Sequence, residues 1–510
     1  MGRAFYITTP IYYPNDVPHI GHGYTTVAAD FLARYHRLKG DDVLFLTGTD
    51  EHGQNLARKA QQAGKTAQEY VDEMEPRWRE VWTRLEISFD DYIRTTEDRH
   101  TAAVTKLLQA VHDNGRDDIY LGTYEGLYCV SCEAYYTEDE LVDGMCPIHH
   151  RPIEQMSEEN YFFRLSAYGD RLLEHYTEDP SRVEPEARRN EVLSLIRQGL
   201  RDFSISRTNF DWGISIPWDP KHVTYVWFDA LTNYITAAGY GTDDEKFSTF
   251  WPALHLVGKD ILRFHAVYWP AMLMAGGVEP PRQVFAHGFL TVGGQKMSKT
   301  NATGIHPFEL TDHFGVDSYR YFFMREIQFG QDGNFSWEAM VERHNADLAN
   351  GLGNLASRVL AMLESNLEGV IPDADPKAEA GSLPGLVEGV VRRYDDAVEN
   401  LALTQALAAI WEVVGEANRY LVERAPWALA KDASKRSELE GVLYTSAEAL
   451  RILAILIVPI MPAAAGRLWT QLGIPESLED QRLPDSARWG GLEPGTKTRR
   501  GESLFPRLDA

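Results

Sequence analysis

Apolar and polar positions in residues 1–50 follow the order strand, helix, strand. A short apolar run at residues 4–8 precedes a turn rich in Pro, Asn and Asp, and a second apolar run occupies residues 43–46. Between these runs, apolar side chains recur close to the helical period of about 3.6 residues until Gly40, at Val27, Ala28, Phe31, Leu32, Tyr35 and Leu38. This βαβ pattern predicts a parallel sheet with a right-handed crossover.

The βαβ pattern is interrupted once and then gives way to helices. Strand-like runs return at residues 223–228, 255–257 and 283–286, after a stretch with clustered cysteines and aromatic residues. Beyond about residue 345 the pattern is helical, with a loop rich in Pro, Asp, Ala and Gly at residues 371–384 and an apolar stripe at Leu348, Leu352, Leu355, Val359 and Met362. We predict an α/β domain whose two halves occupy residues 1–115 and 223–288, with an insertion at residues 116–222 between them. A linker at residues 289–345 and an all-α domain at residues 346–510 follow.

The net charge and the cysteine content of the chain bear on its binding partners and its cellular compartment. The 510 residues include 75 acidic and 50 basic side chains, a net charge of −25 at pH 7. This argues against a polybasic nucleic-acid coat, although a local basic patch still binds phosphate. Three cysteines cannot all pair in one chain, which indicates a reducing compartment. The longest apolar run, residues 452–465, is broken by Pro459 and Pro462, and residues 1–10 lack signal-peptide features, so we predict a cytoplasmic protein.

The segment His19-Ile20-Gly21-His22 lies between the first predicted strand and the first long helix. A helix start presents N–H groups and partial positive charge, which together hold phosphate. Gly21 lets a nucleotide approach the backbone, and two imidazoles here can donate hydrogen bonds to a phosphorus centre as charge builds on its oxygens. Two capping or surface histidines would give the same pattern.

A second candidate site is the polar loop Lys296-Met297-Ser298-Lys299-Thr300, which follows Gly293 and Gly294. Glycines allow movement, and two ammonium groups can neutralise a polyphosphate leaving group. A solvated basic turn is the alternative interpretation of this loop by itself.

All three cysteines of the chain fall within one short segment, as Cys129-x2-Cys132 and Cys146-x2-His149. Two such knuckles, separated by residues 133–145, suit one tetrahedral, closed and therefore structural Zn²⁺ per chain. His149 has the better spacing for the fourth ligand, and the adjacent His150 is its alternative.

The histidine and lysine motifs, in this order and with an α/β half on each side of an insertion, resemble those of the class I aminoacyl-tRNA synthetases. Thr300 stands where the family more often has serine, which keeps a hydroxyl. The resemblance implies a Rossmann-type parallel nucleotide-binding sheet, split by a zinc-bearing insertion and followed by an all-α anticodon-binding domain. Many relatives use four cysteines at the related zinc site, and here a histidine replaces one.

The same resemblance implies a two-step reaction. An amino acid is activated by Mg²⁺ and ATP to an aminoacyl-adenylate, with release of pyrophosphate, and is then transferred to the terminal adenosine of a tRNA. His19, His22, Lys296 and Lys299 would be catalytic. ATP would be bound by these residues together with Gly21 and Asp260.

Further segments, covering nearly the whole chain, are similar to those of the methionine-specific members of this family. They are residues 8–15, 48–53, 226–230, 258–261, 264–265 and 269–272. The resemblance implies L-methionine as substrate and tRNA(Met) as acceptor. Asp50 would hold the substrate ammonium group, and the side-chain pocket would be lined by Ile11, Tyr13, Trp227, Tyr234, Ile261, Phe264 and His265.

The predicted pocket suits a thioether, because sulfur packs favourably at the edges of aromatic rings. The same aromatic residues are also typical of ordinary core. Asp50 follows a predicted strand, where α/β sheets bind ligands, and its alternative role is that of a helix N-cap for the segment after Gly53.

The helical region carries candidates for RNA recognition. Asn354 and Arg358 share a helix face, and Pro426 starts a helix with Trp427 in its first turn. An aromatic ring for stacking and Asn and Arg for base edges suit single-stranded RNA, although structural roles fit these residue types too. By resemblance, we expect Asn354, Arg358, Pro426 and Trp427 to bind the anticodon loop.

Two features of the sequence bear on domains that some relatives carry. The insertion is about the size of the zinc-bearing connective domain alone, so we expect no separate editing domain. No segment resembles the appended tRNA-binding barrel through which some relatives dimerise, and we therefore expect a monomer.

Three other functions share part of this pattern. A small-molecule adenylyltransferase has the nucleotide-binding signature but lacks a helical region such as residues 346–510. A non-catalytic RNA-binding relative should have lost signature residues, and none is lost here. A synthetase for another amino acid would differ in the pocket.

Overall fold

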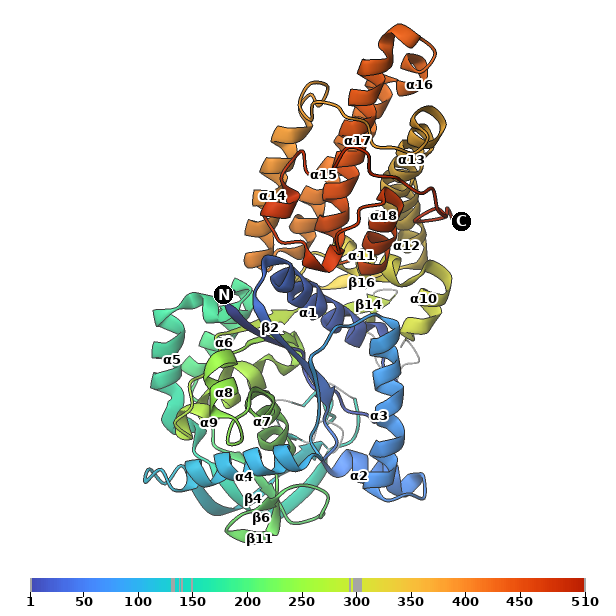
Figure 1. Ribbon diagram of the computed structural model, residues 1–510. Helices are drawn as coiled ribbons and strands as arrows, with labels where there is room; N and C mark the ends of the chain where they lie inside the picture. The colour runs from blue at the N-terminus through green and yellow to red at the C-terminus, as the bar shows by residue number, and fades with distance from the viewer. Residues whose placement is uncertain are drawn as a thin grey trace.

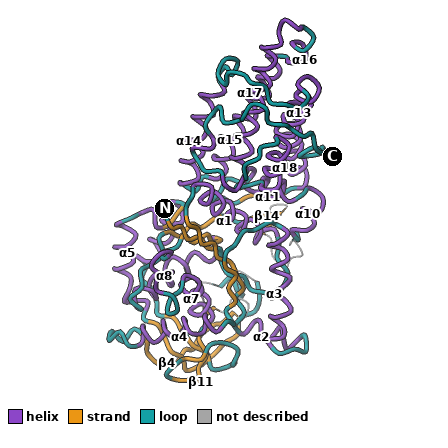
Figure 2. The backbone as a smooth tube through the Cα atoms, viewed as in Figure 1, coloured by secondary structure: helices purple, strands orange, loops and turns teal. Residues whose placement is uncertain are grey.

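A six-stranded, all-parallel sheet forms the centre of the first half of the molecule, in the order β3-β2-β1-β12-β13-β7. Its strands run side by side and are surrounded by helices (Figure 2). Their bounds are β1 (Ala4–Thr8), β2 (Asp42–Thr49), β3 (Asp91–Arg94), β7 (Val183–Glu184), β12 (Leu254–Gly258) and β13 (Gln283–His287). The computed structural model describes residues 2–129, 134–136, 138, 141–147, 150–292, 295–296 and 305–508.

Helices cover both faces of this sheet because side chains alternate along each strand. On β1, Phe5 and Ile7 point into one hydrophobic core, and Tyr6 points into the other. The first core is shared with α1 (Ile20–Lys39) and α3 (Ala67–Arg84) and continues into the helical half of the molecule. The second core is shared with α4 (Asp98–His112), α7 (Val226–Ala238), α8 (Asp244–Phe250) and α9 (Trp269–Ala275).

The strand order reverses between β1 and β12. The chain moves outward from β1 through β2 to β3, and after the insertion it returns on the other side of β1 with β12 and β13. In open α/β sheets, ligands bind in the crevice at the carboxyl ends of the strands at such a reversal. The ends of β1, β2 and β12 therefore mark the expected site.

The predicted βαβ start of the chain is confirmed. Residues 4–8 and 42–49 form paired parallel strands, α1 joins them, and Gly40 ends α1 in the left-handed conformation with φ of 85°. The strands at 254–258 and 283–287 also match the predicted runs.

The predicted strand at residues 223–228 is wrong. Residues 219–224 form β11 (Asp219–Thr224) in a small antiparallel sheet, and α7 begins at Val226. The apolar run Val226-Trp227-Phe228 is the first turn of a helix that is buried on nearly all sides, so it shows no amphipathic period.

The predicted insertion contains its own antiparallel sheet, in the order β5-β4-β6-β8. It also contributes β7, which pairs with β13 and closes one edge of the parallel sheet. The remaining elements of this region are β4 (Ile119–Cys129), β5 (Ala134–Tyr136), β6 (Glu154–Phe163), α5 (Gly169–Glu178), α6 (Glu186–Arg197), β8 (Phe203–Ser204), β9 (Ser206–Arg207) and β10 (Ser215–Ile216).

A small mixed sheet and short helices lead from the α/β half to the helical half. They are β14 (Leu290–Val292), β15 (Gln295–Lys296), α10 (Pro307–Phe314), α11 (Val316–Glu326), β16 (Gly333–Phe335) and α12 (Trp337–Arg343). The chain then forms a π-helical stretch, His344–Gly353, that runs directly into α13 (Asn354–Leu367).

The helical half stands at one end of an elongated molecule, with α16 at its far tip (Figure 1). Its helices are α13, α14 (Leu383–Glu399), α15 (Leu403–Arg424), α16 (Pro426–Leu429), α17 (Arg436–Ile457) and α18 (Pro462–Leu472). The predicted loop at 371–384 is confirmed except at its end, because α14 already begins at Leu383. Within the described part of the chain, none of the helices has the length and apolar character needed to cross a membrane.

Arg320 of α11 joins the two halves. Its fully buried guanidinium donates to Asp30 of α1 at 2.5 Å and to the carbonyl oxygens of Pro459 and Ile460 at 3.0 and 2.8 Å. Arg34 adds a second cation beside Asp30, at 2.7 Å. The turn between α17 and α18 is thereby fixed to the helix that follows the histidine motif.

Candidate active site

The start of α1 is built around two stacked histidines. His19 is the N-cap residue, and its Nδ1 accepts a hydrogen bond from the Gly21 N–H at 3.1 Å. Nδ1 of His22 accepts the His19 N–H at 3.1 Å, and the two ring centroids lie 3.8 Å apart. Because each Nδ1 is an acceptor, the proton of each neutral ring lies on Nε2. Two N–H donors therefore stand at the positive end of α1.

Neighbouring side chains fix this helix start in the crevice. The His22 ring meets Tyr12 and Trp78 edge-on, with centroids 5.1 and 5.0 Å away. One turn further along α1, Thr25 Oγ1 lies 2.7 Å from Nε2 of His287, the last residue of β13. Burial lowers the pKa of His287, which keeps that ring neutral. The loop after β1, helix α3 and strand β13 therefore all contact the start of α1.

The loop after β2 carries Asp50, which is buried and donates its N–H to the Tyr12 carbonyl at 2.9 Å. The next residue, Glu51, is fully buried, and its carboxylate accepts Arg94 Nε at 2.8 Å. The helix N-cap of α2 (Gln54–Gln62) is Gly53, so Asp50 does not serve as that cap. Asp50 instead sits at the carboxyl end of a central strand, as predicted.

Predicted pocket residues from two segments meet beside this loop. Trp227, at the start of α7, stacks on Phe264 with ring centroids 3.7 Å apart and planes 5° from parallel. Phe264 and His265 belong to a π-helical turn, Phe264–Tyr268, that follows β12. Tyr234 lies further along α7, and its hydroxyl is 2.7 Å from Nε2 of His265. The structure thus brings Trp227, Tyr234, Phe264 and His265 into one cluster.

Both nitrogens of His265 are committed to protein partners. Nδ1 lies 3.0 Å from the Ile261 carbonyl, which only accepts, so Nδ1 carries the proton and Nε2 accepts the Tyr234 hydroxyl. Burial lowers the pKa of His265 to about 4, so the ring is neutral. A thioether beside this ring would therefore meet its carbon edge, and the Tyr234 oxygen would offer only lone pairs.

Two of the remaining predicted ATP contacts, Asp260 and Lys296, follow β12 and lie in β15, respectively. Asp260 is exposed just after β12. Lys296 belongs to β15, which pairs with β14 through Thr291, and its side chain lies outside the described residues. Lys299 lies wholly outside them. Lys259 Nζ contacts both carboxylate oxygens of Asp332 at 2.7 Å, which links this loop to the hairpin region.

The predicted zinc knuckle is described only in part. Cys129 ends β4, Cys146 lies between β5 and β6, and both cysteines are buried. Cys132 and His149 lie outside the described residues. His150 has a positive φ of 49° and donates its N–H to the Cys146 carbonyl at 2.9 Å. No group of His, Cys, Asp and Glu suited to a metal occurs among the residues that the structure describes.

Four predicted RNA contacts form what we call the α13–α16 tip: Asn354, Arg358, Pro426 and Trp427. Asn354 is exposed at the first residue of α13, and the Arg358 guanidinium carbon lies 5.2 Å from the Trp427 ring centroid. Pro426 is buried at the start of α16, while Trp427 is 42% exposed. The exposed ring of Trp427 and the Arg358 cation are thus in contact, Asn354 lies one helical turn before Arg358 on α13, and α16 stands at the far tip of the helical half (Figure 1).

Comparisons with known proteins identify the family. The family model "tRNA synthetases class I (M)" matches residues 5–156 and 149–360, and "Anticodon-binding domain of tRNA ligase" matches residues 386–504. The methionine–tRNA ligase of Streptomyces coelicolor is 50% identical over 524 residues, covering 99% of this chain and 97% of that protein. The chain belongs to the methionyl-tRNA synthetase family.

Other members of the methionyl-tRNA synthetase family also match nearly the whole of this chain. The methionine–tRNA ligase of Caldanaerobacter subterraneus is 51% identical over 512 residues, covering 100% of this chain and 80% of that protein. A structure of Mycobacterium tuberculosis methionyl-tRNA synthetase in complex with methionyl-adenylate has a TM-score of 0.93 at 44% identity and covers 99% of this chain and 100% of that chain. The predicted family, the α/β parallel sheet and the helical anticodon domain are therefore confirmed.

Sequence reasoning missed a buried polar network beside the predicted pocket of this methionyl-tRNA synthetase family member. Asp229 of α7 lies 2.7 Å from His52 Nδ1 and 2.7 Å from His100 Nε2. Both His52 and Asp229 fall within segments that resemble the family, but their spacing along the chain gave no sign that they touch. Trp212 also contacts His52, with ring centroids 5.3 Å apart.

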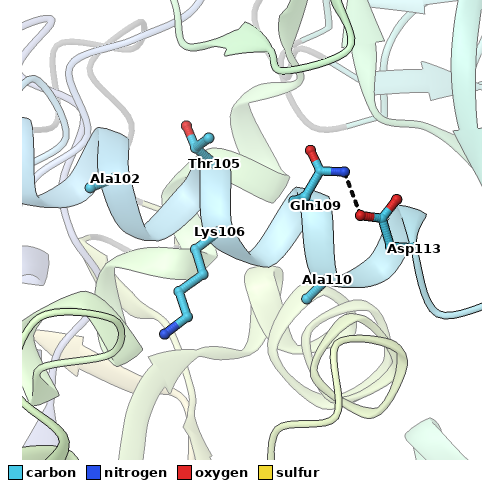
Figure 3. A pocket seen from close by; sticks show the side chains of 6 residues that line it. All are labelled: Ala102, Thr105, Lys106, Gln109, Ala110 and Asp113. Carbon is cyan, nitrogen blue, oxygen red and sulfur yellow. Dashed lines mark hydrogen bonds between the residues drawn. The ribbon is translucent and has the colours of Figure 1, made fainter.

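A shallow depression elsewhere does not belong to this site. It lies along α4 and is lined by Ala102, Thr105, Lys106, Gln109, Ala110 and Asp113 (Figure 3). Gln109 donates to Asp113 at 2.6 Å within it. None of the predicted site residues lines this depression, so the crevice at the strand ends remains the candidate active site.

Proposed function

We propose that this member of the methionyl-tRNA synthetase family joins L-methionine to tRNA(Met) in the crevice at the carboxyl ends of β1, β2 and β12. ATP, methionine and tRNA are the substrates, and ATP enters with Mg²⁺. The observation that carries the placement is the pair of histidines at the start of α1, whose Nδ1 atoms both accept backbone N–H groups. With their Nδ1 atoms accepting, the two neutral rings carry their protons on Nε2 at a helix start, where a nucleotide phosphate is best held.

In the first step, a methionine carboxylate oxygen attacks the α-phosphorus of ATP in line, and the bond to the β-phosphate oxygen breaks to release pyrophosphate. His19 and His22 donate to the oxygens of the transferring group, whose charge grows in the transition state. Gly21 and Asp260 contact the nucleotide, and Lys296 and Lys299 neutralise the leaving pyrophosphate. Positioning and electrostatics supply the rate, with no covalent enzyme intermediate.

Methionine is held between the loop after β2 and the start of α7. Asp50 pairs with the ammonium group, since a buried carboxylate favours a cationic partner. The side chain lies among Ile11, Tyr13, Trp227, Tyr234, Ile261, Phe264 and His265. In the second step, the 2′-hydroxyl of the tRNA terminal adenosine attacks the methionyl carbonyl, and AMP leaves.

The helical domain recognises the tRNA at its other end. At the α13–α16 tip, Trp427 stacks on an unpaired base, and Asn354 and Arg358 bind base edges. The 42% exposure of Trp427 and its contact with Arg358 support this role, because a stacking platform needs an open face. We assign residues 116–222 to the connective insertion and 346–510 to anticodon binding.

Zinc is proposed for the knuckle of the insertion. The buried thiols of Cys129 and Cys146 suit a soft metal, and with Cys132 and His149 they would complete a closed tetrahedral set. The metal would supply folding free energy to the insertion and no catalytic step. One zinc per chain by elemental analysis, lost in Cys146→Ser, is the expected result, and a metal-free wild-type protein that is fully active would contradict it.

The test of the whole assignment is amino-acid-dependent exchange of labelled pyrophosphate into ATP, measured with Mg²⁺ and without tRNA. Exchange with methionine alone is expected, because adenylate formation requires both the nucleotide site and the pocket. Exchange with a different amino acid would contradict the pocket. No exchange with any amino acid would favour a small-molecule adenylyltransferase or a non-catalytic RNA binder.

A further inference from the structure

Asp229 is a fully buried carboxylate held between two histidines from different parts of the fold. Its Oδ2 lies 2.7 Å from Nδ1 of His52, in the loop after β2, and its Oδ1 lies 2.7 Å from Nε2 of His100, in the first turn of α4. Burial alone would raise the pKa of Asp229, but the two histidines, His52 foremost, hold it at about 2. Asp229 is therefore ionised, and each histidine donates an N–H to it.

This network joins the two walls of the proposed methionine pocket. His52 follows Asp50 by two residues, and Asp229 follows Trp227 by two residues. The hydrogen bond between His52 and Asp229 therefore sets the separation of the loop that carries Asp50 from the helix that carries Trp227. The His52 ring cannot flip in place, because flipping would turn a carbon toward the carboxylate.

The loop is clamped from its other side as well. Trp212 of the insertion donates its indole N–H to the Glu51 carbonyl at 2.6 Å and meets the His52 ring edge-on. Glu51 in turn accepts hydrogen bonds from Thr96 Oγ1 at 2.6 Å and from Arg94. Asp229 thus links α7 to a loop that is also hydrogen-bonded from its other side.

We propose that Asp229 is a positioning residue for recognition of the methionine ammonium group, acting through His52 on Asp50. The inference rests on the proposed function, which places the ammonium group at Asp50. A site held in one geometry before the ligand arrives binds more tightly, since less ordering is needed on binding.

The decisive variant is Asp229→Asn. Its amide offers a single acceptor oxygen, so in their present tautomers only one of the two histidines keeps its hydrogen bond, and the negative charge that both histidines face is lost. We expect the KM for methionine in pyrophosphate exchange to rise about tenfold or more, with kcat changed less than about threefold, because binding is lost while the phosphate chemistry is untouched.

Two ligands distinguish a specific loss of ammonium recognition from a general disturbance of the pocket. L-methionine and 4-(methylthio)butanoate, which lacks the amino group, are compared as competitors for equilibrium binding of radiolabelled L-methionine to the protein, measured without ATP. In Asp229→Asn, the inhibition constant of L-methionine should weaken about tenfold while that of the desamino acid stays within about twofold. Equal weakening of both, or no weakening of either, would overturn the proposal.

The His52 position supplies a second test if Asp229→Asn fails to fold. His52→Asn keeps an N–H donor near the place of Nδ1, and His52→Ala removes it. We expect His52→Asn to preserve the preference for L-methionine over the desamino acid and His52→Ala to reduce it. Loss of the preference in both, or in neither, would contradict the role of the hydrogen bond.

Two further variants keep the outcomes distinct. Glu448→Gln alters another buried carboxylate, in α17, that accepts N–H groups from Gly490, Gly491 and Leu492, and it should leave the ligand preference unchanged. Asp50→Asn tests the proposed function itself. If Asp50→Asn keeps the preference, the ammonium site is misplaced; if it abolishes the preference while Asp229→Asn does not, only the positioning role is wrong.

Discussion

The crevice and the α13–α16 tip hold the side chains that we propose to be functional in opposite ways. In the crevice, Nδ1 of His19 and Nδ1 of His22 accept backbone N–H groups, and both nitrogens of His265 have protein partners. Tyr234 and His265 are each 1% exposed. At the tip, Asn354 is exposed, and Trp427 is 42% exposed with the Arg358 guanidinium over its ring.

The contrast follows from the ligands. Methionine and ATP are small and enter a site that must exclude water and direct donors at a growing charge, which requires a preorganised set of groups. An anticodon loop brings bases that are splayed out on binding, so the protein needs open faces that it can stack upon. Substitutions in the crevice should therefore lower the rate of adenylate formation or the stability of the fold. Substitutions at the tip should lower only the rate of transfer to tRNA.

The largest expected effect is at His22. In His22→Asn, the side-chain oxygen can still accept the His19 N–H, but the Nε2–H donor is lost. We expect kcat for pyrophosphate exchange to fall by about 10²–10³-fold, as for loss of one donor to a developing oxyanion, with methionine affinity nearly unchanged.

His22→Gln is the matched variant. Its longer amide places an N–H near the position of Nε2 but no longer caps the His19 N–H, so it should keep more turnover than His22→Asn and have a lower melting temperature. Steady-state exchange and thermal unfolding measure the two effects. A His22→Asn enzyme that loses methionine affinity and keeps its turnover would contradict the proposed role of His22 at the transferring phosphate.

A smaller, step-specific effect is expected at Trp427. Loss of one stacked base costs about 1–3 kcal/mol, so Trp427→Ala should lower kcat/KM for tRNA about five- to 150-fold. Pyrophosphate exchange without tRNA should be unchanged, since α16, which carries Trp427, stands at the far tip of the helical half (Figure 1).

Two controls sharpen the Trp427 experiment. Val422→Ala removes another exposed apolar side chain, 59% exposed on α15, and should leave tRNA charging unchanged. Trp427→Phe keeps a ring and should recover part of the loss. If charging by Trp427→Ala equals that of the wild type, the tip does not read the anticodon.

Hydrophobic patterns within short segments predict those helices and strands whose residues are amphipathic or clearly bounded. The sequence shows the helical period of α1, its end at Gly40 and the apolar runs of β1 and β2. It does so because the strand, helix and strand of a βαβ unit follow one another along the chain. The run at residues 226–228 was assigned to a strand because α7 is buried almost all round and lacks a polar face. The two-residue strand β7 was too short to leave a pattern.

For the candidate site, the sequence predicts which residues lie at the ends of strands and helices, but not which side chains contact one another. The position of His19 at a helix start followed from the sequence, but the stacking of its ring on His22 depends on backbone geometry. Asp229, His52 and His100 are far apart along the chain, and only the packing of α4 and α7 beside the β2 loop brings them together. No spacing rule contains that information.

The smallest expected effect is on stability and concerns His265. Its folded pKa of about 4 lies below the ordinary value of 6.5, because burial disfavours the cation. The unfolded chain therefore takes up a proton first as pH falls, so the stability contributed by the neutral ring is complete above about pH 6.5 and is lost toward pH 4.

At about pH 5 this loss should amount to roughly 2 kcal/mol relative to about pH 7.5. His265→Gln removes the titrating ring, so its melting temperature should fall less than that of the wild type over the same interval. His313→Gln, at an exposed histidine of α10, should keep the wild-type slope. A His265→Gln slope equal to that of the wild type would mean that the ring is protonated in the folded crevice, and the hydrogen bond from Tyr234 to its Nε2 would then have to be abandoned.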